Sequence, residues 1–252
     1  MKQLICSAAF TGLLFSFAMG GFAAPAVTVY YEENAQVELI SSKGTRVLID
    51  VGLPSKLSNP ATEADILLTT HTHWDHANDG FLSNFKGKQL FVRTGEIRTA
   101  DVSIQGIASA HRKGDLFLSE NGTNYIFIVD MDGLRIVHFG DIGQESLTLE
   151  QLAMLGKVDV AVMQFVNSYS QMDVENKKGF KLMQQVRPRL IIPTHTGPTA
   201  VQFAMTLWHC LYSDNASVRI SRDNLPKDTQ LLFLGSLAEV YSEFTNASAI
   251  EW

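Results

Sequence analysis

The sequence lacks the features that mark several specialised classes of protein. Its 18 glycines and 7 prolines make up about a tenth of 252 residues, which excludes collagen-like, low-complexity and disordered chains. It has 20 basic and 26 acidic residues, and no basic cluster is longer than Lys177-Lys178. This balance disfavours nucleic acid, or a membrane surface held by bulk charge, as a partner. A small-molecule partner is expected instead.

The first two dozen residues differ in composition from the rest. One positive charge at Lys2 precedes a mostly apolar run from Leu4 to Met19, and small residues follow from Gly20 to Ala26. This order is typical of a secretory signal, and the apolar run is short of the roughly 20 residues that span a bilayer. We expect residues 1–23 to be a signal peptide cleaved after Ala23, so that the protein is exported, periplasmic or secreted, with no membrane anchor.

Cysteine is also scarce. The chain contains only Cys6 and Cys210, and cleavage after Ala23 would remove the first of them. The mature protein could then form no internal disulfide, so its stability must come from its core and from any bound metal. No later stretch resembles a linker or a membrane span, and residues 24–252 are expected to form one domain.

Both strands and helices are expected. Short runs rich in β-branched residues predict strands at residues 27–31, 35–40, 45–50, 64–70, 102–109, 160–165 and 190–192. Asp132-Gly133 predicts a hairpin between residues 124–130 and 134–139. Apolar residues at helical spacing predict helices after Thr148, at 174–186 and at 198–212, and Thr148 with Gln151 forms a capping box.

A weak internal repeat underlies this pattern. The segment from Arg46 to Gly52 is similar to that from Arg135 to Gly143, and Ala64–Leu68 is similar to Val158–Val162. The offset between the matched segments is nearly constant. We therefore expect two similar halves of about 95 residues related by a pseudo-twofold axis.

The segment Thr70–Ala77 carries the clearest chemical signal. It reads Thr-His-Thr-His-Trp-Asp-His-Ala and directly follows a β-rich run. Three imidazoles and a carboxylate at a strand end can converge on metal ions. His71 and His73 can chelate one ion, while Asp75 and His76 can reach a second ion nearby.

The spacing His71-x-His73-x-Asp75-His76 after an apolar strand resembles the signature of the metallo-β-lactamase superfamily. This resemblance implies an α+β fold, an αββα four-layer sandwich with two pseudo-symmetric halves. The family pattern continues in this chain at His111, Asp141 and His195. It implies that His71, His73 and His111 hold one zinc ion, that Asp75, His76 and His195 hold another, and that Asp141 touches both.

The resemblance also implies an activity. With two zinc ions per chain, a bridging hydroxide would attack an ester, lactone, amide or phosphodiester, with Asp141 as the bridge and Asp75 as a candidate proton relay. Iron and manganese are alternative metals. Two alternative functions are a mononuclear iron dioxygenase of the persulfide type and a non-catalytic metal-binding protein.

Particular residues narrow the subfamily. Class B1 β-lactamases have a cysteine where this chain has Asp141, and flavodiiron proteins have a carboxylate where it has His73. Both subfamilies are therefore disfavoured. The run Thr123–Asp141 is most similar to the branch of ascorbate-6-phosphate lactonase and N-acyl phosphatidylethanolamine phospholipase D. That branch usually has a glycine-rich turn after the strand at 160–165, where this chain has Gln164, Asn167, Ser168 and Tyr169 instead.

The other two histidines are not expected to bind metal: His138 is expected either to pack in the core or to support a ligand from behind, and His209 is expected to be structural. His138 shares a strand face with Leu134 and Ile136, and His209 falls within the helix expected at 198–212. Asp50 either orients a ligand imidazole from behind or makes a turn. Trp74 is a candidate for the pocket rim, while Phe81 is expected to pack in the core.

Overall fold

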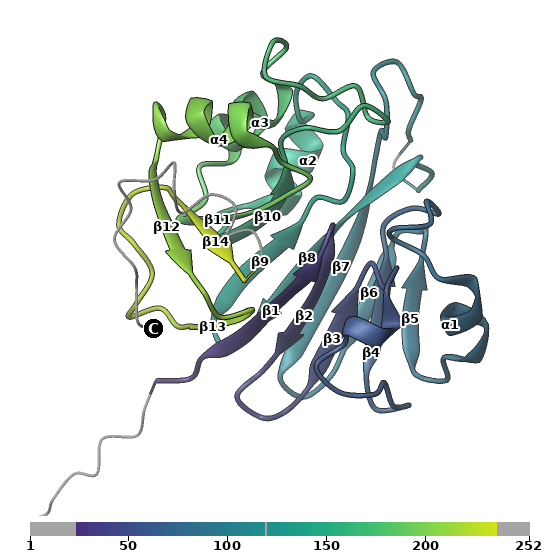
Figure 1. The fold of residues 1–252 in the computed structure, drawn as a ribbon. Coiled ribbons are helices and arrows are strands. Elements are labelled where there is room, and N and C mark those ends of the chain that lie inside the picture. Colours follow the sequence, from purple (N-terminus) through teal and green to yellow (C-terminus); the bar gives the residue numbers. More distant parts are fainter. Residues whose placement is uncertain (1–23, 119, 236–252) are drawn as a thin grey trace, which may run out of the picture.

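The computed structural model describes residues 24–118 and 120–235. Their strands form two sheets, whose arrangement is visible in Figure 1. The first sheet has the strand order β13 (Ser217–Ile220), β1 (Val27–Glu33), β2 (Gln36–Ile40), β3 (Arg46–Ile49), β4 (Ile66–Thr69) and β5 (Lys88–Phe91). The second has the order β12 (His209–Ser213), β14 (Gln230–Leu234), β11 (Leu190–Thr194), β10 (Val160–Gln164), β9 (Leu134–His138), β8 (Asn124–Met131), β7 (Val102–Ser109) and β6 (Gly95–Arg98).

The two sheets pack face to face around the main core. Alternate residues of both sheets, such as Val29, Leu39, Phe127 and Ile192, are buried between them. This alternation is what a strand with one inward face requires.

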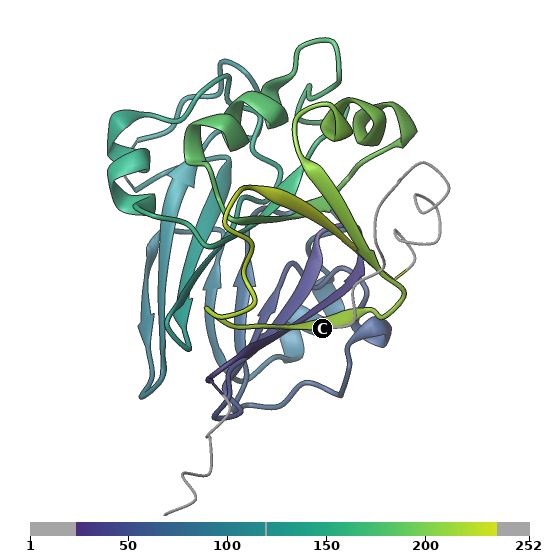
Figure 2. The ribbon, with the colours of Figure 1, turned by 90° about the vertical axis from the view of Figure 1, so that its left-hand side faces the viewer.

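Helices cover the outer face of each sheet. α2 (Leu149–Leu155), α3 (Lys178–Val186) and α4 (Pro198–Met205) pack on the second sheet, and they lie together on one side of the molecule in both views (Figures 1 and 2). α1 (Asp79–Asn84) lies on the opposite side, where Phe81 packs near Leu48 and Leu67 of the first sheet. The expected αββα four-layer sandwich is therefore confirmed. A short 3₁₀ helix, Pro54–Lys56, lies in the connection between β3 and β4.

The two halves have the same strand topology. In the first, β1, β2 and β3 pair antiparallel, and β4 and β5 then continue in parallel. In the second, β7, β8 and β9 pair antiparallel, and β10 and β11 continue in parallel. The sequence repeat thus marks equivalent strands, since β3 corresponds to β9 and β4 to β10.

Local signals in the sequence were accurate where they depend on near neighbours. Thr148 and Gln151 form the capping box at the start of α2, and Gly156 ends that helix with φ 57°. Asp132 and Gly133 join β8 to β9 with φ of 48° and 75°, as a tight hairpin turn requires.

Two helix predictions were partly wrong. The helix expected at 198–212 ends at Met205, and residues 209–213 form strand β12, which pairs in parallel with β14. Sheet pairing with a distant strand overrides the helical spacing there. The helix expected at 174–186 begins only at Lys178, because Asp173 and Asn176 first form a hydrogen-bonded turn.

The expected signal peptide, residues 1–23, lies outside the described residues. Within the described part of the chain, no helix combines the length and the apolar character needed to cross a membrane.

Candidate metal centre

Four strand ends deliver the predicted ligands to one place. The segment 71–76 follows β4, His111 follows β7, Asp141 follows β9 and His195 follows β11. Strand ends are suited to this task because a rigid sheet fixes where each loop starts. The structure brings all seven predicted residues together in two neighbouring groups.

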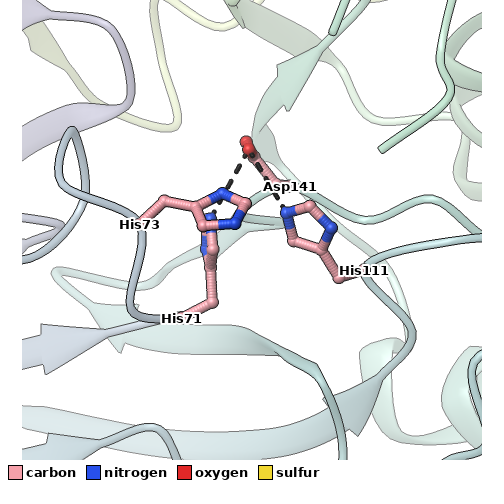
Figure 3. Close-up of side chains that lie close together, drawn as sticks. All are labelled: His71, His73, His111 and Asp141. Carbon is pink, nitrogen blue, oxygen red and sulfur yellow. Dashed lines mark ion pairs between the residues drawn. The ribbon is translucent and has the colours of Figure 1, made fainter. Parts of the chain in front are cut away.

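The first group contains three imidazoles and one carboxylate. His71, His73 and His111 form a near-regular triangle, with ring centroids 4.6, 4.7 and 4.7 Å apart. Figure 3 shows the three rings and Asp141 pointing toward one another. Asp141 Oδ2 lies 3.6 Å from His71 Nε2 and 3.7 Å from His111 Nε2.

The second group contains Asp75, His76 and His195. The Nε2 atoms of the two histidines are 3.2 Å apart. Asp75 Oδ2 lies 3.8 Å from His76 Nε2 and 3.7 Å from His195 Nε2. Asp141 reaches this group through its other oxygen, Oδ1, which is 3.3 Å from His76 Nε2 and 3.5 Å from His195 Nε2.

Asp50 supports both groups from behind. Its Oδ2 lies 2.8 Å from His76 Nδ1 and accepts a hydrogen bond from Thr70 Oγ1 over 2.7 Å. Because the Thr70 hydroxyl donates to Asp50, its oxygen accepts from His71 Nδ1, 3.0 Å away. The Nε2 atom of His71 is therefore left with its lone pair directed into the site. Of the two roles expected for Asp50, the structure favours orientation of the imidazoles.

Backbone conformation also holds the centre. Asp50 and His195 have φ of 54° and 35°, in the left-handed region that side chains rarely adopt. The His195 carbonyl accepts hydrogen bonds from the backbone N–H groups of Phe165 and Val166, at 3.1 and 2.7 Å. Asn124 fixes Asp141 by accepting its backbone N–H over 2.9 Å.

The electrostatics of the site favour cation binding. Burial and the neighbouring His76 lower the pKa of His71 to about 2, so its imidazole is neutral at physiological pH. Burial would lower the pKa of His76 as well, but the carboxylates of Asp50 and Asp141 outweigh it and raise that pKa to about 10. Burial disfavours the charged form of Asp141, but the close approach of the His111, His76 and His195 imidazoles holds its pKa well below the usual range. Asp141 is thus a carboxylate, a form that binds metal.

Buried donor atoms without partners indicate what the site can bind. In the described part of the chain, His71 Nε2, His111 Nε2 and Asp141 Oδ1 are buried and make no hydrogen bond. A buried polar atom is normally satisfied, so three unpartnered donors gathered at one site favour a bound ligand there. Donors around a tetrahedral zinc ion with bonds of 2.0–2.2 Å lie about 3.4 Å from one another. Asp141 lies 3.3–3.7 Å from the Nε2 atoms of His71, His76, His111 and His195, and the Nε2 atoms of His76 and His195 are 3.2 Å apart, so these donors fit a zinc ion.

The remaining candidates lie outside both groups. His138 is buried, and its Nε2 lies 2.9 Å from the Ala35 carbonyl oxygen, consistent with the expected structural role. His209 is exposed on strand β12, not on a helix. Trp74 is 72% exposed beside the site, while Phe81 packs in the small core under α1.

The sequence alone assigned no role to Asn167, Ser168 and Tyr169, which follow β10. Asn167 Nδ2 donates to Asp141 Oδ2 over 2.6 Å, and the Tyr169 ring lies 5.4 Å from that of His73. Arg112 Nε donates to the Tyr169 carbonyl over 3.1 Å, which ties this turn to the His111 loop. A cluster of polar residues at a strand end was the only sequence signal for these contacts. The contacts themselves join segments that are distant in the chain, so the sequence could not predict them.

Comparison with known protein families agrees with this geometry. The model of the β-lactamase superfamily domain matches residues 29–195, which is more than half of the chain. The match includes every residue of the two groups. The chain therefore belongs to the metallo-β-lactamase superfamily.

Individual relatives are distant. A UPF0173 metal-dependent hydrolase of Thermococcus onnurineus is 25% identical over 197 residues, covering 67% of this chain and 84% of that protein. Among solved structures, a proposed zinc-dependent hydrolase of this superfamily from Thermotoga maritima has a TM-score of 0.61 at 19% identity, covering 83% of this chain and 98% of that one. A proposed metal-dependent hydrolase from Parabacteroides distasonis has a TM-score of 0.54 at 18% identity, covering 82% and 93%. At these identities the structural likeness concerns the fold.

Proposed function

We propose that this protein is an exported dinuclear zinc hydrolase that cleaves an ester, lactone, amide or phosphodiester in a small molecule. Its family and relatives support the coarser part of this statement, a metal-dependent hydrolase of the metallo-β-lactamase superfamily. The observation that carries the finer part is the position of Asp141. Its two oxygens face different donor groups, which suits a carboxylate between two cations.

In this proposal His71, His73 and His111 hold one ion, and Asp75, His76 and His195 hold the other. Bound zinc supplies a water of lowered pKa and polarises a carbonyl or phosphoryl oxygen. The protein contributes the orientation of the donors: Asp50 and Thr70 fix His71 and His76, and Asn124 fixes the backbone of Asp141.

Proton handling is assigned to Asp75. Its side chain is 17% exposed, whereas that of Asp141 is 2% exposed, so Asp75 is the carboxylate of the pair that solvent and substrate can reach. A partly exposed carboxylate at the site can accept a proton from the attacking water and deliver it to the leaving group. Asp141 is too enclosed for this exchange and serves as the bridge.

The test combines metal content with activity. The mature protein should contain about two zinc ions per chain after reconstitution, and it should hydrolyse at least one member of a panel of esters, lactones, amides, thioesters and phosphodiesters. A protein with one iron ion that consumes oxygen would instead support the dioxygenase alternative. Two bound ions without turnover of any substrate would support a non-catalytic metal-binding protein.

A further inference from the structure

Asn167 contacts the centre without belonging to either donor group. Its Nδ2 donates to Asp141 Oδ2 over 2.6 Å, and the two residues are 8% and 1% exposed. The Oδ1 atom of Asn167 accepts the backbone N–H of Tyr169 over 2.9 Å. The amide can therefore present only its NH₂ group to Asp141.

The backbone around Asn167 is firmly held. Asn167 and Met172 form a two-sided β-bridge with N–H···O distances of 2.8 and 2.9 Å, which closes the turn 167–172. Inside this turn, Ser170 Oγ accepts from Gln164 Nε2 at the end of β10, over 2.9 Å. The backbone that carries the amide donor is thus anchored to the second sheet, and the Tyr169 N–H holds the other end of the amide.

This contact distinguishes the two oxygens of Asp141. Oδ1 faces His76 and has no hydrogen-bond donor, whereas Oδ2 faces His111 and also receives the Asn167 amide. Rotation of the carboxylate would exchange the two oxygens, and the Asn167 hydrogen bond opposes that rotation. A hydrogen-bonded carboxylate oxygen also offers less negative charge to a cation than a free one does.

We propose that Asn167 is a positioning residue that holds Asp141 in its bridging orientation and makes the two metal sites unequal. The inference rests on the proposed dinuclear function. An ion bound by the three histidines would keep more positive charge, because the Asp141 oxygen that faces it, Oδ2, also accepts a hydrogen bond from the Asn167 amide. The other ion would receive the undiminished charge of Oδ1 together with that of Asp75.

Titration of the metal-free protein with Co²⁺ tests this proposal, because the visible spectrum of cobalt reports the ligand geometry of each site. In Asn167→Ala we expect the ion held by His71, His73 and His111 to bind about 10-fold more weakly, because losing the orientation of Asp141 outweighs the negative charge that Oδ2 regains. The cobalt spectrum of that site should change as well. Ser168→Ala, an exposed position in the same turn, is the matched control and should behave as wild type.

Asn167→Asp separates positioning from simple support of the turn. The aspartate keeps an oxygen that can accept the Tyr169 N–H, but it has no amide donor for Asp141. We expect its cobalt spectrum to depart from wild type, whereas a residue that only shaped the turn would give the wild-type spectrum. If wild type binds two Co²⁺ ions and both Asn167 variants match it in affinity and spectrum, the inference is overturned. If wild type itself binds no Co²⁺, the proposed function fails and the inference fails with it.

Discussion

Asp141 is the residue that connects the two groups, because its Oδ2 faces His71 and its Oδ1 faces His76. Asp141→Ala should remove one metal equivalent per chain and lower any hydrolytic rate by at least about 10²-fold, since the two cations would lose the charge between them. Metal analysis and steady-state kinetics on the same preparation check this expectation.

His209→Ala is the control for that experiment. His209 is exposed on β12 and lies outside both groups, so its loss should leave the metal content unchanged. Retention of both metals in Asp141→Ala, together with their loss in His209→Ala, would contradict the ligand assignment.

Glu32 has a protonation state that should shape the pH dependence of stability. Both of its carboxyl oxygens are buried, and burial together with the neighbouring Glu38 raises its pKa to about 10. The folded protein therefore keeps this proton between about pH 4.5 and 10, whereas the unfolded chain releases it. Over that range the free energy of unfolding falls as the pH rises, because the unfolded state binds fewer protons.

Glu32→Gln removes this dependence. We expect the variant to be more stable than wild type by more than about 1 kcal/mol at pH 8, and the difference to vanish below pH 4.5. Urea unfolding of both proteins at several pH values measures it. A difference that stays constant with pH would show that Glu32 is ionised in the folded protein.

The connection between β3 and β4 supports the metal-binding segment through close packing. A Cβ atom on Gly52 would clash with the Asp75 carbonyl oxygen, because the two backbones lie in contact. Gly52→Ala must displace the segment that carries His73, Asp75 and His76. We expect metal affinity to fall by about 10-fold or more while the far-UV circular dichroism stays native.

Gly80→Ala provides the comparison. Gly80 lies in α1, and an added Cβ would meet only the Asn78 side chain at 3.4 Å, an ordinary contact. This variant should bind metal as wild type does, because alanine suits a helix better than glycine. Equal metal affinity in the two variants would mean that the Gly52 contact is not needed.

Export concerns the whole molecule. The composition of residues 1–23 motivates the proposal that the mature chain begins near Ala24 outside the cytoplasm. N-terminal sequencing of the native protein checks it. Recovery of Met1 on a cytoplasmic protein would exclude it.

Short-range patterns carried much of the architecture. The capping box at Thr148, the Asp132-Gly133 turn and the strand alternation depend on neighbours a few residues apart, and the structure agrees with each. The sequence repeat indicated the two halves, and the structure shows that the repeated segments form equivalent parallel pairs, β3 with β4 and β9 with β10. The His71–His76 segment predicted a metal centre for the same reason, since its four donors lie within six residues of one another.

Contacts between distant segments could not be predicted from local sequence and were decided by the tertiary structure. His209 lies on a strand because β14 pairs with it, and no local pattern near His209 reports that partner. The hydrogen bonds from Asn167 to Asp141 and from Arg112 to Tyr169 join residues 26 and 57 positions apart. Residue type and spacing could select the donors, because coordination chemistry restricts which side chains bind metal. The partners that orient those donors are ordinary polar residues, and only the packing of the two sheets brings them into contact.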